Sequence, residues 1–110
     1  MNNIAEFQII GRVARTAQVG SALKVTLAAN YGTKDKTTNE WKEDPHFNTV
    51  TIFGEGTQDY IEKHIATGDL VHARGRIRQS NYEKNGETVY TVDLICTEFS
   101  RLAKVLDQAD

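Results

Sequence analysis

Three arginines recur at every second position of one short segment: Arg74, Arg76 and Arg78. Because side chains of a β-strand alternate between its two faces, this spacing predicts a strand with three guanidinium groups on one face and Ile77 toward a core. Guanidinium groups fit phosphate oxygens and stack on aromatic planes. The alternative is a solvated strand face that pairs with acids across a hairpin, such as Glu87 or Asp93. No acid is interleaved with the arginines, so the pattern favours a polyanion ligand.

A second set of residues with chemical potential lies in the segment Phe47–Gly54. Alternation predicts a strand with Val50 and Ile52 on one face and the rings of Phe47 and Phe53 on the other, ~20 Å apart along the strand. Phenylalanine rings beside a basic groove form a stacking platform for the bases of single-stranded nucleic acid, worth roughly 1–3 kcal/mol per base. The alternatives are packing under the 31–46 segment and burial in a subunit interface.

Tyr82 is a further candidate, since it lies near the tip of a predicted hairpin whose turn is Asn85-Gly86. A tyrosine at such a tip either packs locally or contacts a ligand. Its basic neighbours, Arg78 and Lys84, favour a ligand contact.

Residues 31–46 are almost wholly polar and are predicted to form a long hairpin loop. This loop carries two aromatic residues, Tyr31 and Trp41, among several lysines that include Lys34. Two hairpins with aromatic residues near their tips are suited to hold an extended strand between them. Packing of Trp41 back onto the protein is the alternative.

The sequence offers little support for an enzyme, a metal site or a cofactor. The three histidines are scattered, without a spacing that implies a metal site, and no nucleophile elbow or Gly-rich phosphate loop is present. The single cysteine, Cys96, excludes an internal disulfide and lies in an apolar run that predicts burial. We therefore expect a binding protein; a nucleic-acid hydrolase is the enzyme alternative.

The elements that must position these residues follow from hydrophobic periodicity. Alternation predicts strands at residues 4–13, 23–29, 47–53, 70–79 and 87–96, and Gly11 predicts a bulge or sharp bend in the first. A helical stripe predicts a helix over residues 55–67, and a second short helix is predicted over 98–106. The order predicts an all-β OB-fold, a five-stranded Greek-key barrel with one helix between the third and fourth strands.

Composition limits the remaining possibilities. A chain of 110 residues with 25% charged residues is one ordinary domain, and we expect a binding domain over residues 1–103 followed by a short C-terminal tail, 104–110. The net charge of −2 argues mildly against a polyanion ligand, although local fields matter more than totals. No apolar run approaches the ~20 residues that span a bilayer, and no secretory signal is present, so we expect a cytoplasmic protein without a membrane partner.

The chain resembles the bacterial single-stranded DNA-binding protein family over roughly residues 3–103. The matching pieces, in chain order, are Ile9–Val13, Leu27–Asn30, Phe47–Gly54, Lys63–Gly68, Arg74–Ile77 and Tyr82–Gly86. The resemblance implies an OB-fold that binds single-stranded DNA without sequence preference in replication, recombination and repair, in the nucleoid, as a homotetramer or a dimer. It also implies base stacking on the positions of Phe47, Phe53 and Tyr82.

Several features depart from the family pattern. A further family aromatic aligns with Thr33, with Tyr31 two residues away as a substitute, and Trp41 does not align with a stacking residue. The family's flexible linker and acidic tip are not found after residue 103, so recruitment of replication and repair proteins through such a tip is not carried over. Residues 14–21 are shorter than the corresponding family segment.

These residues support two hypotheses. In the first, the rings stack on bases while cations neutralise phosphates, the cations being Arg12, Arg74, Arg76, Arg78, Lys34 and Lys84. In the second, the chain is an accessory OB module of the primosome type, whose exposed aromatics bury in a subunit or partner interface.

Overall fold

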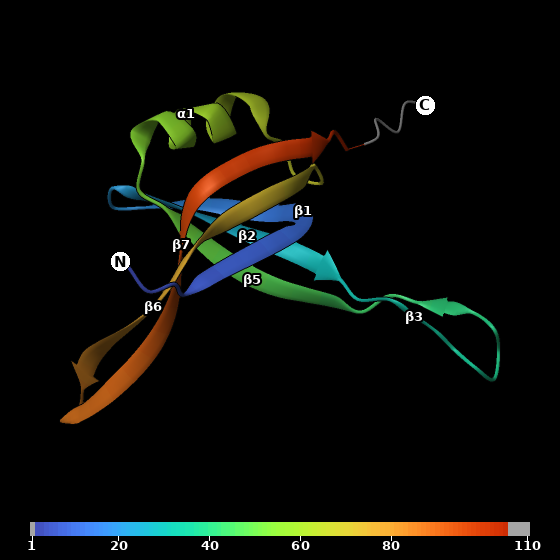
Figure 1. Ribbon diagram of the computed structural model, residues 1–110, viewed down its shortest axis with the longest axis horizontal. Helices are drawn as coiled ribbons and strands as arrows, with labels where there is room; N and C mark the ends of the chain where they lie inside the picture. Colours follow the sequence, from blue (N-terminus) through green and yellow to red (C-terminus); the bar gives the residue numbers. More distant parts are fainter. Residues whose placement is uncertain (1, 106–110) are drawn as a thin grey trace.

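The computed structural model describes residues 2–105 and consists of seven strands and one helix (Figure 1). In chain order they are β1 (Glu6–Val19), β2 (Ala22–Asn30), β3 (Thr33–Lys34), β4 (Trp41–Lys42), β5 (Pro45–Ile52), α1 (Glu55–His64), β6 (Leu70–Lys84) and β7 (Glu87–Ala103).

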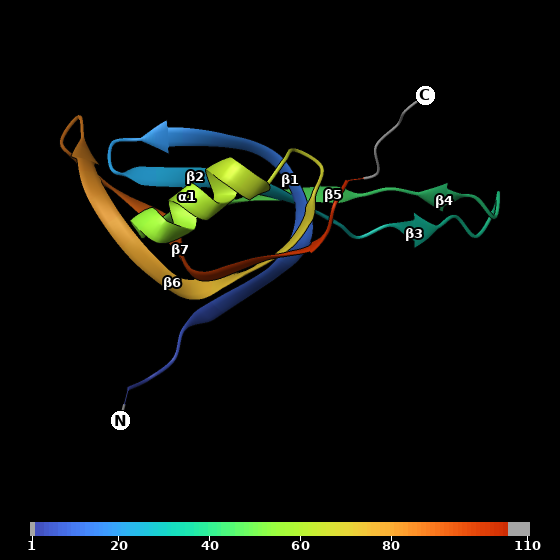
Figure 2. The same ribbon diagram turned by 90° about the horizontal axis from the view of Figure 1, so that it is seen from above.

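Five of the strands close into a barrel with the order β1-β2-β5-β7-β6. All neighbouring pairs are antiparallel except β5 and β7, whose short parallel pairing at Val50↔Leu94 and Thr51↔Ile95 closes the barrel. Helix α1 connects β5 to β6 and lies over one end of the barrel (Figures 1 and 2). This is the OB-fold, and the predicted five-stranded barrel with one helix between the third and fourth barrel strands is confirmed.

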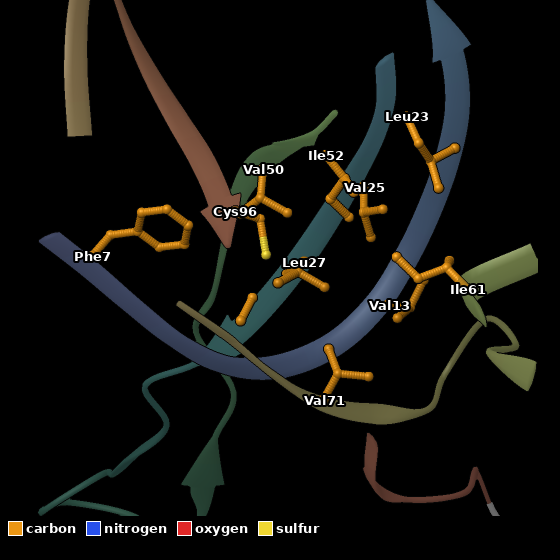
Figure 3. Packing of buried hydrophobic residues seen from close by; sticks show 11 residues of the cluster. Phe7, Val13, Leu23, Val25, Leu27, Val50, Ile52, Ile61, Val71 and Cys96 are labelled. Carbon is orange, nitrogen blue, oxygen red and sulfur yellow. The ribbon is translucent and has the colours of Figure 1, made fainter. Parts of the chain in front are cut away.

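The core is formed by the apolar residues that alternate along the barrel strands (Figure 3). Val25 and Leu27 of β2, Val50 of β5 and Val71 of β6 are fully buried. Helix α1 closes one end of this core with Ile61, which is also buried. Alternation therefore orients the outward side chains as predicted for β2 and for the barrel part of β5.

Strand β1 pairs with two neighbouring strands and bends between the two pairings. Its first half, Glu6–Arg12, pairs with β6, and its second half, from Arg12 to Val19, pairs with β2. At Gly11 the backbone passes so close to β2 that a Cβ atom would lie 2.6 Å from the carbonyl oxygen of Ala28. A register shift follows between Val13 and Arg15, so the predicted bend in this strand is confirmed.

A buried carboxylate fixes the connection between α1 and β6. Asp69 is 2% exposed, and its two oxygens accept hydrogen bonds from the backbone N–H groups of Ala66 (2.9 Å) and Val105 (2.8 Å). The Arg101 guanidinium lies 3.7 Å away. These N–H groups, and then Arg101, hold the pKa of Asp69 below its usual value despite its burial.

Four sequence predictions of local structure are corrected. The helix over residues 98–106 is wrong, because β7 continues to Ala103 in register with β6; Leu106 lies outside the described residues. The first strand does not end at 13 but continues to Val19. The 31–46 segment contains the small β3–β4 sheet. Ile77 is 41% exposed because β6 has left the barrel at that point.

Residues 2–105 hold neither a membrane-spanning helix nor a metal-binding cluster. No helix there has the length and apolar character needed to cross a membrane. Over the same residues, no three His, Cys, Asp or Glu side chains are grouped in a way that could hold a metal ion.

Candidate nucleic-acid interface

The structure brings Phe47 and Arg12 into one row on the outer surface of the barrel. Phe47 of β5 pairs with Ala28 of β2, and Ala28 pairs with Arg12 of β1. Since neighbouring strands are ~4.8 Å apart, the two backbones are separated by roughly 10 Å, with only a methyl group between them. The Phe47 ring is 59% exposed, and the Arg12 guanidinium donates to the Gly68 carbonyl oxygen at 2.9 Å. A solvent-facing ring and an anchored cation therefore lie two strands apart.

An open groove of about 380 Å³ adjoins this row. Its lining comes from β1, β2, β6, the start of β5 and the connection that precedes β5: Ile10, Gly11, Arg12, Ala28, Asn30, Glu43, Pro45 and Leu70. The volume lies in the range of small-ligand sites. Five of these residues are apolar or glycine, and Arg12, Asn30 and Glu43 add a cation, an amide and a carboxylate.

Phe53 follows the last residue of β5 and is 51% exposed. Between the two rings the outward side chains of β5 are threonines. Thr49 shares a hydrogen bond with Thr26 (2.9 Å), and Thr51 accepts one from the Lys24 ammonium (2.7 Å). Lys24 was not among the residues predicted for the site. The alternation of β2 places Lys24 opposite the core, but only the β2–β5 register shows that it lies between the two rings.

Ion pairs distinguish the three arginines predicted to share one face of β6. Arg74 lies 3.2 Å from Glu6 and 3.7 Å from Glu98, and Arg78 lies 3.6 Å from Asp93. Within residues 2–105, Arg76 takes part in no ion pair. The acid-paired alternative thus describes Arg74 and Arg78, and Arg76 is the arginine that remains available to a polyanion.

Tyr82 shares one face of a projecting hairpin with the last two arginines. Beyond the barrel, β6 and β7 continue as a two-stranded ribbon in which Arg78 pairs with Asp93 and Tyr82 with Val89. The ribbon ends in the predicted turn, where Asn85 (φ 54°) and Gly86 (φ 81°) both have the positive φ of a type I′ turn. Tyr82 is 50% exposed. Two residues beyond it along β6 lies Lys84, also exposed.

The other projecting hairpin carries Trp41, which pairs across β3–β4 with Lys34. The indole is 66% exposed, and it lies so close to Gly32 that a Cβ atom there would be 2.7 Å from Nε1. Glycine at this position lets the indole rest on the backbone. Tyr31, at the base of this hairpin, is 68% exposed and meets His46 edge to face at 5.6 Å.

Side chains within the β3–β4 hairpin hold its shape. The Asp35 carboxylate accepts hydrogen bonds from the backbone N–H groups of Thr37 (2.7 Å) and Thr38 (3.3 Å) and pairs with Lys42 at 3.3 Å. Those N–H groups first, and then Lys42, lower the pKa of Asp35. The hairpin is therefore a defined arm and not a structureless loop.

The predicted residues consequently form three groups rather than one cluster. Phe47 and Arg12 lie on the barrel, and the two hairpins project from different sides of it (Figures 1 and 2). The molecule extends 50 × 38 × 37 Å. Such a distribution of rings and cations suits an extended chain and not a compact small molecule.

An OB barrel with exposed rings and cations on its outer surface is typical of oligonucleotide-binding proteins. The model of the "Single-strand binding protein family" matches residues 4–102, and the chain belongs to this family. Membership confirms the resemblance and the prediction of a non-enzymatic protein of the single-stranded DNA-binding class.

Two relatives illustrate the distance within the family. The "Single-stranded DNA-binding protein" of Rickettsia felis is 26% identical over 106 residues, which cover 90% of this chain and 70% of the relative. The protein of the same description from Treponema pallidum is 24% identical over 115 residues, covering 99% of this chain and 64% of the relative.

Three solved structures share the fold. They are the Plasmodium falciparum SSB complex with ssDNA (TM-score 0.69, 18% identity, 93% of this chain and 97% of that chain), the S. cerevisiae mitochondrial protein Rim1 (0.70, 16%, 93% and 98%) and the small single-stranded DNA-binding protein of Streptomyces coelicolor (0.63, 19%, 91% and 95%). At these identities the likeness supports the fold alone.

Proposed function

We propose that this protein coats single-stranded DNA without sequence preference and protects it during replication, recombination and repair. The observation that carries the proposal is the exposed Phe47 ring in register with the Arg12 cation, on the barrel of a single-strand binding family member. Every base has a face on which a ring can stack, so stacking selects no sequence. Bases in a duplex are covered by their neighbours, so the same rings discriminate against double strands.

Each predicted site residue has a role in this proposal. The stacking residues are Phe47, Phe53 and Tyr82 on the positions that match the family, with Tyr31 and Trp41 on the β3–β4 arm. The phosphate-neutralising residues are Arg12, Arg76, Lys34 and Lys84, joined by Lys24 between the two phenylalanines. Arg74 and Arg78 have carboxylate partners and contribute less.

We also propose that the protein is a homo-oligomer, a tetramer or a dimer. Among the described residues, β2 pairs with β1 only from Arg12 onward, so one edge of Glu6–Gly11 has no strand beside it. Unpaired edges are sites of strand addition. Ile4 (80%) and Ile10 (54%) are exposed near this edge and would be covered in such an assembly.

The other expectations remain proposals. They are a DNA-binding domain over residues 1–103, a tail over 104–110 and a cytoplasmic, nucleoid-associated location. Most of the tail lies outside the described residues, and tip-mediated recruitment of repair proteins is not part of the proposal.

The test is a titration of the Trp41 and tyrosine fluorescence with oligo(dT) at two salt concentrations. Phe47→Ala and Phe53→Ala are each expected to weaken binding about 5- to 150-fold, the equivalent of 1–3 kcal/mol, without changing the salt dependence. Val19→Ala is the matched control, since Val19 is 56% exposed at the far end of β1. Equal affinity for duplex and single strand contradicts the proposal.

The same two alanine variants distinguish the accessory-module hypothesis from DNA binding. The exposure of Phe47 and Phe53 also fits a protein interface. In that case the two alanine variants change the mass measured by light scattering and leave the DNA affinity unaltered.

A further inference from the structure

A buried carboxylate that has no part in the proposed function lies in residues 65–69, which connect α1 to β6 and which we call the 65–69 loop. The Asp69 side chain is almost fully buried, and its two oxygens accept hydrogen bonds from the backbone N–H groups of Ala66 and Val105. Ala66 precedes β6 and Val105 follows β7. One side chain therefore joins the 65–69 loop to the end of the last strand.

The same loop is hydrogen-bonded to β1 at the position of Arg12. The Gly68 N–H donates to the Val13 carbonyl oxygen (2.8 Å), and the Val13 N–H donates to the Asp69 carbonyl oxygen (3.0 Å). The Gly68 carbonyl oxygen in turn accepts a hydrogen bond from the Arg12 guanidinium at 2.9 Å. The 65–69 loop thus contacts both the backbone of β1 and the cation that β1 contributes to the candidate interface.

Val105 confines Gly68 from the other side. The φ angle of Gly68 is +97°, and a Cβ atom added there would lie 2.7 Å from Cγ2 of Val105. The Asp69 carboxylate holds the backbone of Val105, and the Val105 side chain packs on Gly68. The Gly68 carbonyl group then fixes the direction of the Arg12 side chain.

A carbonyl oxygen orients an arginine without cancelling its charge. The guanidinium has five N–H donors, and a neutral acceptor on one of them leaves the others, and the whole positive charge, for a phosphate. Among residues 2–105, Arg12 takes part in no ion pair, whereas Arg74 faces two carboxylates. A long side chain that is held in one orientation before DNA binds loses less entropy when the contact forms.

We infer that Asp69 is a positioning residue for DNA binding, because it holds the 65–69 loop so that Gly68 directs the Arg12 guanidinium toward a phosphate. The inference rests on the proposed function, since it requires that Arg12 meets DNA. Asp69 is buried and does not touch the DNA itself. Its effect has the opposite sign to that of its charge: neutralising a carboxylate near a polyanion strengthens binding, whereas loss of positioning weakens it.

The experiment is a double-mutant cycle of Asp69→Asn and Arg12→Ala, with affinity for a short oligo(dT) measured at one salt concentration. Asp69→Asn preserves the size of the side chain but replaces one acceptor oxygen with an NH₂ group, so one of the two backbone N–H groups loses its acceptor. We expect this change to weaken binding about fivefold in the parent protein and by less than about 1.5-fold in the Arg12→Ala background. A purely structural role of Asp69 changes the affinity equally in both backgrounds. Circular dichroism verifies that each variant is folded.

A second variant tests the same path without changing any charge. Gly68→Ala forces a contact with Val105 and displaces the carbonyl group that holds Arg12, so we expect binding to weaken about threefold. Gly20→Ala is the matched control. Gly20 also has a positive φ (60°), but it lies in the turn between β1 and β2, where an added Cβ meets no atom within 4 Å. Its affinity for the oligonucleotide is expected to equal that of the parent.

Three results overturn the inference: an Arg12→Ala variant with the affinity of the parent, an Asp69→Asn variant that binds equally or more tightly, and equal effects of Asp69→Asn in the two backgrounds. Equal affinities of the Gly68→Ala and Gly20→Ala variants also contradict it. All of these results leave DNA binding by the parent protein intact. A parent protein that does not bind oligo(dT), or that binds duplex equally well, refutes the proposed function instead.

Discussion

Arg74 and Arg76 lie two residues apart on β6 and form a matched pair that separates a structural arginine from a DNA-binding one. The Arg74 guanidinium lies 3.2 Å from Glu6 and 3.7 Å from Glu98, and all three side chains are partly exposed. Arg76 is exposed as well, and no ion pair reaches it from the rest of residues 2–105. A phosphate therefore competes with two carboxylates for Arg74 and with water alone for Arg76.

The magnitude follows from counterion release. Each phosphate neutralised on a single strand contributes about −0.7 to the slope of log K against log salt. Between 50 and 200 mM salt, a loss of one contact therefore changes the ratio of the two dissociation constants by about 2.6-fold. We expect Arg76→Ala to reduce the slope by about 0.7 and Arg74→Ala to leave it within error. The double variant Glu6→Gln/Glu98→Gln frees Arg74 and is expected to steepen the slope by about 0.7.

The assay is the fluorescence titration with a short oligo(dT) at five or more salt concentrations, with circular dichroism to verify folding. An equal loss of slope in the two alanine variants refutes the distinction between these arginines. A slope that does not steepen when both glutamates are neutralised refutes the claim that carboxylates withhold Arg74 from DNA.

Two further predictions concern stability, measured by urea unfolding at one fixed protein concentration. Asp69→Ala is expected to lower the free energy of unfolding by about 3 kcal/mol near neutral pH, because the partly buried N–H groups of Ala66 and Val105 both lose a charged acceptor. Since folding lowers the pKa of Asp69, this contribution is complete above the unfolded pKa of about 3.9 and is lost as pH falls through the lower folded value. If the difference in unfolding free energy between the parent and Asp69→Ala is the same at low pH, the ionised carboxylate is not the source of the stability. Gly75→Ala is expected to cost about 3 kcal/mol or more, because the added Cβ would lie 1.8 Å from the Ile95 carbonyl oxygen. Gly56→Ala in α1 meets open space and is the control; equal stability of the two variants refutes the steric argument.

The fold could be predicted because local alternation identifies the buried face of most barrel strands; part of β7 is the exception. Val25 and Leu27, or Val50 and Ile52, need no knowledge of their partners to be recognised as core. The signal for the turn at Asn85-Gly86 is also local, since a type I′ turn requires two adjacent residues that tolerate positive φ. Because Val50 and Ile52 occupy the core face of β5, the same pattern predicts that Phe47 and Phe53 lie on the opposite, exposed face.

The parts of the site that depend on register could not be predicted from the sequence. Glu6 pairs with Arg74 across 68 positions of the chain, and Lys24 reaches Thr51 across 27. These contacts arise only when β1 is laid against β6 and β2 against β5. Opposite charges in a sequence are numerous, and periodicity does not state which of them meet.

Strand β7 has two extra residues relative to β6, Leu102 and Thr97; both interrupt the alternation of the segment predicted as a helix, and Thr97 also determines the two faces of the hairpin. Glu98 pairs with Arg74, but the next β6 residue pairs with Cys96, so Thr97 has no partner in the register. A bulge of this kind reverses which side chains face the core. On the C-terminal side of Thr97, Phe99 pairs with the buried Ala73 and faces the core. On the N-terminal side, the inward residues are Cys96 and Leu94. The inward positions therefore change from odd to even numbers at Thr97, and this interrupted alternation led to the wrong helix prediction.

The same reversal decides what the hairpin presents. In an unbulged strand, continued in register from the Arg74↔Glu98 pair, Arg78 would pair with Leu94, and the apolar residues of β7 would share the arginine face. The bulge instead pairs Arg78 with Asp93 and moves Leu94, Val92 and Tyr90 to the other side. The separation of the hairpin face that carries Arg76 and Tyr82 from the uncharged opposite face therefore follows from the extra residue at Thr97 and not from the composition of either strand.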